Sequence, residues 1–182
     1  MRGRILRAGL LGAVVLIVWT FVVNGVFGLQ SRLDMNSVPT EDHVHQVLRD
    51  SLPGPGRYII NPPEPPKGIP PGDGPVYSVL FSGVGHPAAG SLMLLDLVLF
   101  LLAPLLAAWL LSQASDRILA AYPRKVLFFS ALGLLLALVC DVPRFGIGGY
   151  PPQDALLFAA NRLITWTLVG VAISWRIRPG HR

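Results

Sequence analysis

Apolar residues gather in four long runs that are separated by segments rich in polar residues, proline and glycine. The runs are Ala8–Gly28, Ser91–Leu111, Val126–Cys140 and Ala155–Trp175. A helix that crosses a bilayer needs about 20 mainly apolar residues, so the first, second and fourth runs predict membrane-spanning helices. The third run is short and spans only if neighbours such as Tyr122 or Val142 extend it; a tilted or partly re-entrant segment is the alternative.

Composition supports the same class of protein. Of the 182 residues, 52% are apolar and only 14% are charged, whereas soluble domains carry about 25% charged residues. The single cysteine, Cys140, excludes an intrachain disulfide framework, a CxxC redox centre and a Cys-rich zinc site. The chain is therefore expected to be embedded in a membrane.

Basic residues near the ends of the runs predict the orientation. With four spans, nine of them fall on one side: Arg2, Arg4, Arg7, Arg117, Arg124, Lys125, Arg176, Arg178 and Arg182. The segment Leu29–Gly90 on the other side holds four basic and six acidic residues. Because cytoplasmic loops carry an excess of lysine and arginine, we expect both termini in the cytoplasm and residues 29–90 outside.

The first run also resembles a signal peptide, since arginines precede it. Its apolar core is long for a signal peptide, and no A-x-A cleavage site follows it. We therefore expect an uncleaved membrane anchor, with cleavage as the alternative.

The outer segment predicts a small cap. Thr40–Ser51 is typical of a short amphipathic helix that Thr40 caps and whose apolar stripe is Val44, Val47 and Leu48. The sequences RYII and VYSVLF predict two short strands, joined by a proline- and glycine-rich connection. Such a cap is too small for a core of its own, so we expect it to lean on the outer ends of the membrane helices.

These elements divide the chain into three parts. Residues 1–28 form the N-terminal tip and the first helix, residues 29–90 the extracytoplasmic cap segment, and residues 91–182 the remaining helices and the tail. The predicted fold is an all-α membrane protein: a four-transmembrane-helix bundle with a cap of one short helix and a two-stranded β ribbon.

Two charged residues lie inside the predicted spans. Asp96 and Arg162 lie roughly 8 and 11 Å from the outer ends of their helices. A charge in a span costs about 2.5–3.5 kcal/mol on insertion scales and usually finds a partner inside the bundle. We expect Arg162 to pair with Asp96, with Asp141 as the second candidate. The pair is interpreted as structural; snorkelling of Arg162 to headgroups and a proton or anion site are the alternatives.

Other polar residues surround this pair. Asn161 is about 100° round the helix from Arg162, so it is expected to bond a different neighbouring helix. Arg144 and Tyr150 lie in the outer loop after the third run, together with Asp141 at its start. They serve either as interfacial anchors or as the rim of a lipid or quinone pocket.

Motifs for other chemistry are missing from the sequence. His43 and His45 are two residues apart, whereas a zinc pair on a helix needs a spacing of three or four. Neither a nucleophile elbow nor a Walker loop occurs. We expect no catalytic residues, no metal, no cofactor and no nucleic-acid partner.

The outer segment also carries a short motif, G-x-Y-x-x-x-P, followed by a Gly-Pro strand. Its residues are Gly56, Tyr58 and Pro62, then Gly74 and Pro75. With one helix before it and three after it, this layout resembles a loose group of uncharacterised small bacterial four-helix inner-membrane proteins with no assigned activity. The resemblance implies the architecture and a bacterial inner membrane, and it transfers no functional residue.

The expected function is non-catalytic. The chain is expected to be an accessory or scaffold subunit, surrounded by membrane lipids, that packs against a larger membrane complex or another copy of itself. The alternative is binding or transport of a small molecule, such as a lipid, a quinone or an anion, centred on Arg162.

Overall fold

The computed structural model describes the chain except residues 1, 35, 61–75, 85, 146–148 and 178–182. Four helices in the described part are long and apolar enough to cross a membrane: Gly3–Val26, Gly90–Ser112, Tyr122–Arg144 and Pro152–Arg176. The prediction of four long apolar helices is thus confirmed, and the chain is consistent with a multi-pass membrane protein.

Two of the four spans change helix type toward one end. α1 (Arg2–Phe21) continues as a π-helical turn, η1 (Val22–Val26). α6 (Tyr122–Leu136) continues as a second π-helical turn, η2 (Ala137–Asp141), and a 3₁₀ turn, η3 (Val142–Arg144). These turns, together with Tyr122 at the start, lengthen the short third run to a 23-residue span.

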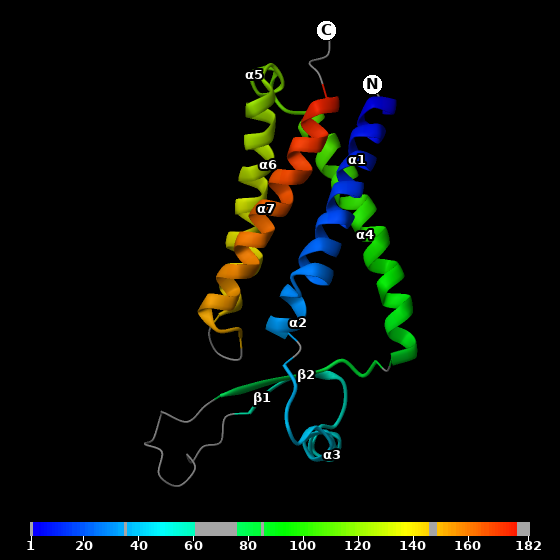
Figure 1. Ribbon diagram of the computed structural model, residues 1–182, viewed down its shortest axis with the longest axis vertical. Coiled ribbons are helices and arrows are strands. Elements are labelled where there is room, and N and C mark those ends of the chain that lie inside the picture. Colours follow the sequence, from blue (N-terminus) through cyan, green and yellow to red (C-terminus); the bar gives the residue numbers. More distant parts are fainter. Residues whose placement is uncertain (1, 35, 61–75, 85, 146–148, 178–182) are drawn as a thin grey trace.

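The other two spans are single helices. α4 (His86–Ser112) is continuous through Pro104, and α7 (Pro152–Arg176) begins after Pro151. A short helix, α5 (Asp116–Leu119), connects α4 to α6. The start of α1, the end of α7 and α5 lie at one end of the bundle (Figure 1). We call this the basic end, and the opposite end, which bears the ribbon and α3 (Glu41–Ser51), the cap end.

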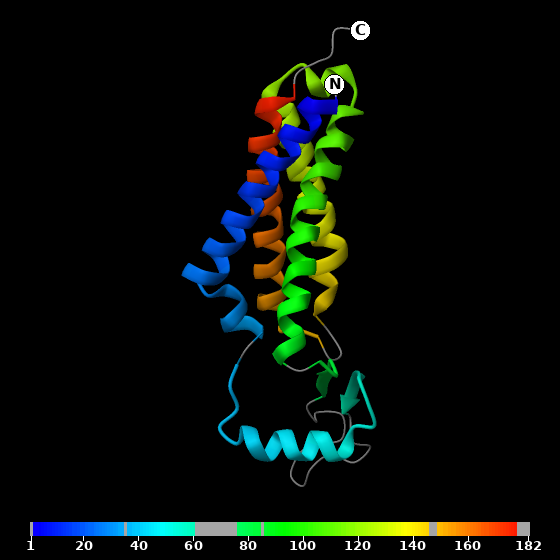
Figure 2. The same cartoon turned by 90° about the vertical axis from the view of Figure 1, so that its right-hand side faces the viewer.

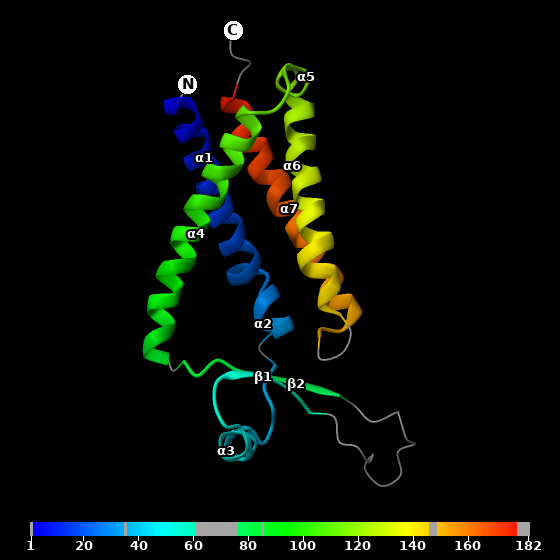
Figure 3. The ribbon, with the colours of Figure 1, turned by 180° about the vertical axis from the view of Figure 1, so that it is seen from behind.

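The helices form an open row and not a closed bundle. The extensive contacts join α4 to α1, α1 to α7, and α7 to α6. Figures 1 and 3 show α4 and α6 on opposite flanks, with α4 diverging from the other helices toward the cap end. α1 therefore lies between α4 and α7.

Small residues allow the helices in this row to approach closely. A Cβ atom on Gly12 of α1 would lie 2.8 Å from the Ile173 side chain of α7 and 3.2 Å from Pro104 of α4. Gly133 of α6 packs in the same way against Trp166 of α7. Small residues at such crossings bring helix backbones together in membranes. Several small residues of the four spans are buried: Ala8, Gly12, Ala107, Gly133, Ala137, Ala155 and Ala159.

The core is concentrated toward the basic end. The largest buried apolar side chains there are Leu111, Phe129, Val169 and Ile173. The buried residues of α4 among those described are Pro104, Ala107, Ala108 and Leu111, all in its basic-end half. Residues 90–99, in the cap-end half of α4, contribute no buried side chain to this core.

The cap contains the predicted helix and ribbon. β1 (Gly56–Ile60) pairs antiparallel with β2 (Tyr77–Phe81), with Tyr58 opposite Val79. A short helix, α2 (Leu29–Asp34), follows Gly28, whose positive φ of 62° suits glycine at this bend. The predicted connection at 61–75, and with it Pro62, Gly74 and Pro75, lies outside the described residues.

Two details of the cap differ from the prediction. Thr40 precedes α3, but its side chain makes no capping hydrogen bond. All of α3 is described and none of its residues is buried; Val44 and Val47 of the apolar stripe are exposed. The reason is the position of the ribbon, which lies between α3 and the membrane helices (Figures 1 and 2). α3 therefore does not lean on the ends of those helices.

The close approach of α6 and α7 predicts a large effect of one methyl group. In Gly133→Ala, the new Cβ would lie 2.8 Å from the Trp166 Cβ and 3.3 Å from the Leu163 Cα, positions that cannot swing away. Overpacking of this kind costs about 1–3 kcal/mol, measured as a lower free energy of unfolding in detergent. The matched control is Gly90→Ala, whose Cβ meets nothing within 4 Å. Equal stability of the two variants would contradict the helix contact.

Candidate functional site

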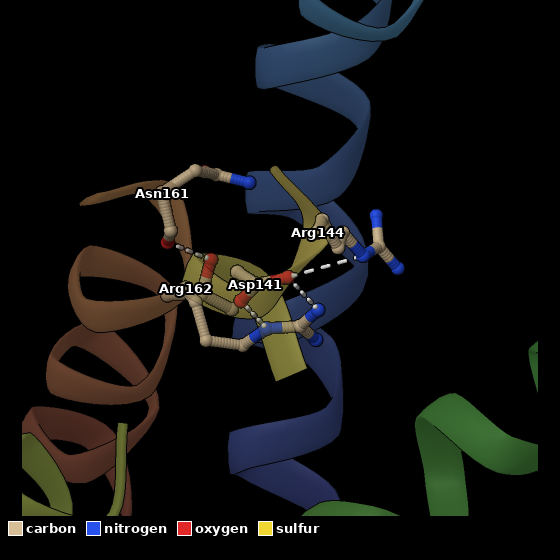
Figure 4. Close-up of polar contacts among 5 residues, drawn as sticks. Asp141, Arg144, Asn161 and Arg162 are labelled. Atoms are coloured by element: carbon tan, nitrogen blue, oxygen red, sulfur yellow. Dashed lines mark hydrogen bonds and ion pairs between the residues drawn. The ribbon is translucent and has the colours of Figure 1, made fainter. Parts of the chain in front are cut away.

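The charged residues of the third and fourth spans meet at Asp141. Arg162 Nε donates to Asp141 Oδ2 at 2.8 Å, and Arg162 Nη2 donates to Asp141 Oδ1 at 3.0 Å (Figure 4). Such a fork of two charge-assisted bonds fixes geometry as well as charge. The Asp141 side chain is only 1% exposed. It ends the π-helical turn η2, and π-helical turns inside α-helices are frequent at functional sites.

The expected pair of Arg162 with Asp96 is therefore wrong. Arg162 lies on α7, whose neighbours in the row are α1 and α6. Asp96 lies on the exposed cap-end half of α4, on the far side of α1. The guanidinium group of Arg162 turns to Asp141, so the snorkelling alternative is not observed either. The sequence indicates how deep each residue lies along its helix, but it does not indicate which helices are neighbours.

Arg144 is a second cation beside Asp141. Its Nε lies 4.0 Å from Asp141 Oδ1, and its guanidinium group lies over two aromatic rings, 5.7 Å from the centroid of Tyr150 and 5.6 Å from that of Phe158. The two rings meet edge to face, with centroids 5.3 Å apart. The backbone N–H of Tyr150 donates to the Arg144 carbonyl oxygen at 2.8 Å. The predicted loop residues Arg144 and Tyr150 are thus brought to the same site as Asp141 and Arg162.

Asn161 faces a different helix, as its angular offset from Arg162 predicted (Figure 4). The indole Nε1 of Trp19 on α1 donates to Asn161 Oδ1 at 3.1 Å. Trp19 was not identified as a partner from the sequence. The available signal was the indole N–H itself, which seeks an acceptor when it lies inside an apolar run.

The cluster around Asp141 is positively charged and partly exposed. Two guanidinium groups share one carboxylate, so the cluster of Asp141, Arg144 and Arg162 carries one excess positive charge. Both oxygens of Asp141 accept hydrogen bonds from Arg162, which leaves this buried carboxylate poorly placed to relay protons. The arginine side chains remain 40% and 42% exposed, so the cluster can meet an anion from outside the bundle.

Away from this cluster, the cation Lys125 is buried at the basic end. Its Nζ donates to the carbonyl oxygens of Ser174 at 2.8 Å and of Ile177 at 2.6 Å, at the end of α7. A cation is favourable there because the last carbonyls of a helix lack partners and carry partial negative charge. In the sequence, Lys125 served only as one of the basic residues that predict the orientation of the chain in the membrane. The signal was its place in the first turn of α6, which antiparallel packing sets beside the end of α7.

The remaining candidates form no site in the described part of the chain. No group of three or more histidine, cysteine or acidic residues there could hold a metal ion. His43 and His45 are exposed on α3. No known protein family, curated protein or solved structure matches this chain. The resemblance to small bacterial inner-membrane proteins therefore stays a prediction.

A double-mutant cycle tests which acid holds Arg162. Asp141→Asn keeps the shape but removes the charge, and we expect it to lower the free energy of unfolding by about 1–3 kcal/mol, because Arg162 loses a charged partner. Combined with Arg162→Gln, the two losses should be non-additive by more than about 0.5 kcal/mol.

The matched cycle uses Asp96→Asn with Arg162→Gln. Its effects should add within about 0.3–0.5 kcal/mol, as expected for sites without a shared partner. Unfolding of the purified protein in mixed detergent, followed by circular dichroism, gives all these values. Coupling of Asp96 but not Asp141 to Arg162 would refute the observed pairing.

Proposed function

We propose that the chain is a non-catalytic integral membrane protein that acts as an accessory or scaffold subunit. It packs through the cap-end half of α4 against a helix of a larger membrane complex. The observation that carries this proposal is the exposure of that half-helix together with its one charged residue. Both oxygens of the Asp141 carboxylate are already bonded to Arg162, which agrees with a role without catalysis.

The cap-end half of α4 buries none of its described side chains. Every residue from 90 to 99 is exposed, and most are large and apolar, including Met93, Leu94 and Leu95. Lipid alone could cover such a surface. Lipid chains alone do not satisfy the carboxylate of Asp96, which no hydrogen bond or ion pair reaches from the described residues.

A charge at this depth favours a protein partner. Asp96 is six residues from the start of the span Gly90–Ser112, about 9 Å along the helix. A charged side chain at the centre of a span costs about 2.5–3.5 kcal/mol, and such residues usually find a partner. A neighbouring helix that presents lysine, arginine or a hydrogen-bond donor would remove much of this cost.

The proposed occupant is a helix of a different protein. Copies of this chain enter the membrane with the same topology, so a symmetric contact between two α4 helices would bring Asp96 against Asp96 at equal depth. Two like charges repel strongly in a medium of low dielectric constant. A complementary helix from another subunit avoids this repulsion.

We also infer the location: the inner membrane of a bacterium, with both termini in the cytoplasm and the cap outside. This inference is supported by the basic residues gathered at one end, among them Arg4, Arg7, Arg117, Arg124 and Arg176. Excess lysine and arginine near span ends mark the cytoplasmic side.

Site-specific photo-crosslinking in intact membranes tests the docking face. A photoreactive residue replaces Leu94 of α4 or, as the matched control, Leu127 of α6; both leucines are 67% exposed. We expect a discrete protein adduct at position 94 and mainly lipid adducts at 127. Asp96→Leu should reduce the yield at 94 several-fold, because the partner's donor loses its acceptor.

The adduct's mass and peptides identify the occupant. A different membrane protein, lost with Asp96→Leu, supports the proposal. An adduct between two copies of this chain would replace the proposed partner with a homo-oligomer. Equal yields at positions 94 and 127, with lipid at both, would show that α4 faces only the bilayer and would overturn the scaffold function.

A further inference from the structure

We propose that Arg144 and Arg162 form a binding site for a phosphate group at the cap end of the bundle. The phosphate belongs to a phospholipid headgroup or to a free phosphate ion, since the two present the same oxygens to the protein. This site lies at α6 and α7, and it does not depend on what packs against α4.

The two arginines retain charge and hydrogen-bond donors that are available to a ligand. Arg162 uses Nε and Nη2 on Asp141, and no hydrogen bond from its Nη1 to the described residues occurs. The Arg144 guanidinium makes no hydrogen bond within the described chain, and its contact with Asp141 is long, at 4.0 Å. One carboxylate thus serves two cations, and an anion would balance the remaining charge.

Both arginines are held in place before any anion arrives. Arg162 is fixed by its two bonds to the buried Asp141. Arg144 is stacked over Tyr150 and Phe158, and the hydrogen bond from the Tyr150 backbone to its carbonyl fixes the chain around it. Groups that are ordered in advance lose less entropy on binding, so they bind more tightly.

The position and the chemistry of these donors suit a phosphate group. Arg144 is the last residue of the third span, so a membrane that covers the four helices places it near the phosphates of one leaflet. Guanidinium groups match phosphate oxygens with paired N–H donors. Two such groups on two elements can reach different oxygens of one tetrahedral phosphate.

Lipid binding by the full-length protein in detergent, followed by native mass spectrometry, tests the site. The probes are dioctanoyl phosphatidylglycerol, dioctanoylglycerol, which has the same chains without phosphate, and inorganic phosphate. We expect Arg144→Gln to weaken binding of the phosphate-bearing probe by about tenfold or more, the loss of one charge-assisted hydrogen bond. Arg32→Gln on α2, an exposed arginine at the same end, should leave binding unchanged.

The source of the phosphate follows from the probes. Arg144-dependent binding of the lipid without binding of inorganic phosphate identifies a headgroup site, whereas the reverse identifies a free-ion site. Because Arg144 is exposed and the Asp141–Arg162 pair stays intact, Arg144→Gln should fold, which its unfolding midpoint without lipid checks. Should it not fold, Arg144→Lys keeps the charge, loses the paired donors and should still weaken binding.

Three results would overturn the site. One is equal binding of phosphatidylglycerol to the wild type and to the folded Arg144 variant. Another is equal binding of dioctanoylglycerol and phosphatidylglycerol, which would assign affinity to the chains alone. The third is no binding of either phosphate-bearing probe. None of these bears on the α4 docking face, which the crosslinking experiment tests separately.

Discussion

Polar side chains inside an apolar bundle need partners, because hydrocarbon offers no water to replace a missing hydrogen bond. The fold satisfies this constraint mainly through α7. Its Arg162 is bound to Asp141 of η2, its Asn161 accepts from Trp19 of α1, and its last carbonyls accept from Lys125 of α6. α7 is therefore tied to α1 and to η2 at the adjacent residues Asn161 and Arg162, and to α6 at its end, which fixes its rotation and its depth.

Features that depend on local sequence were predictable. Four spans follow from run length, and the ribbon follows from short β-prone segments around a proline-rich connection. The three basic clusters are predicted on the same side of the membrane, because two spans separate each cluster from the next. The third span was also predictable, because Tyr122 and Val142 extend its short apolar run. Each of these inferences concerns one segment and its own residues.

Features that depend on helix order were not predictable from one sequence. Asp96 and Arg162 have similar depths, but depth does not say that α1 separates α4 from α7. The hydrogen bonds of Lys125 to the end of α7 can be predicted only if it is known that the start of α6 lies beside the end of α7. The exposed stripe of α3 likewise follows from a ribbon that lies between it and the helices. In each case the missing information is which elements are neighbours.

The open row leaves one unmatched charge at each edge. Small residues allow α4, α1 and α7 to pack closely toward the basic end. The cap-end half of α4 diverges from the other helices, with Asp96 exposed. At the α6–α7 edge, Arg144 and Arg162 share a single carboxylate. These opposite charges cannot neutralise each other within the chain, because α1 lies between α4 and α7. A cation brought by a partner helix would satisfy Asp96 and leave the arginines unchanged, whereas a phosphate at the arginines would leave Asp96 unpaired. The two proposed binding events are therefore independent in chemistry and in place.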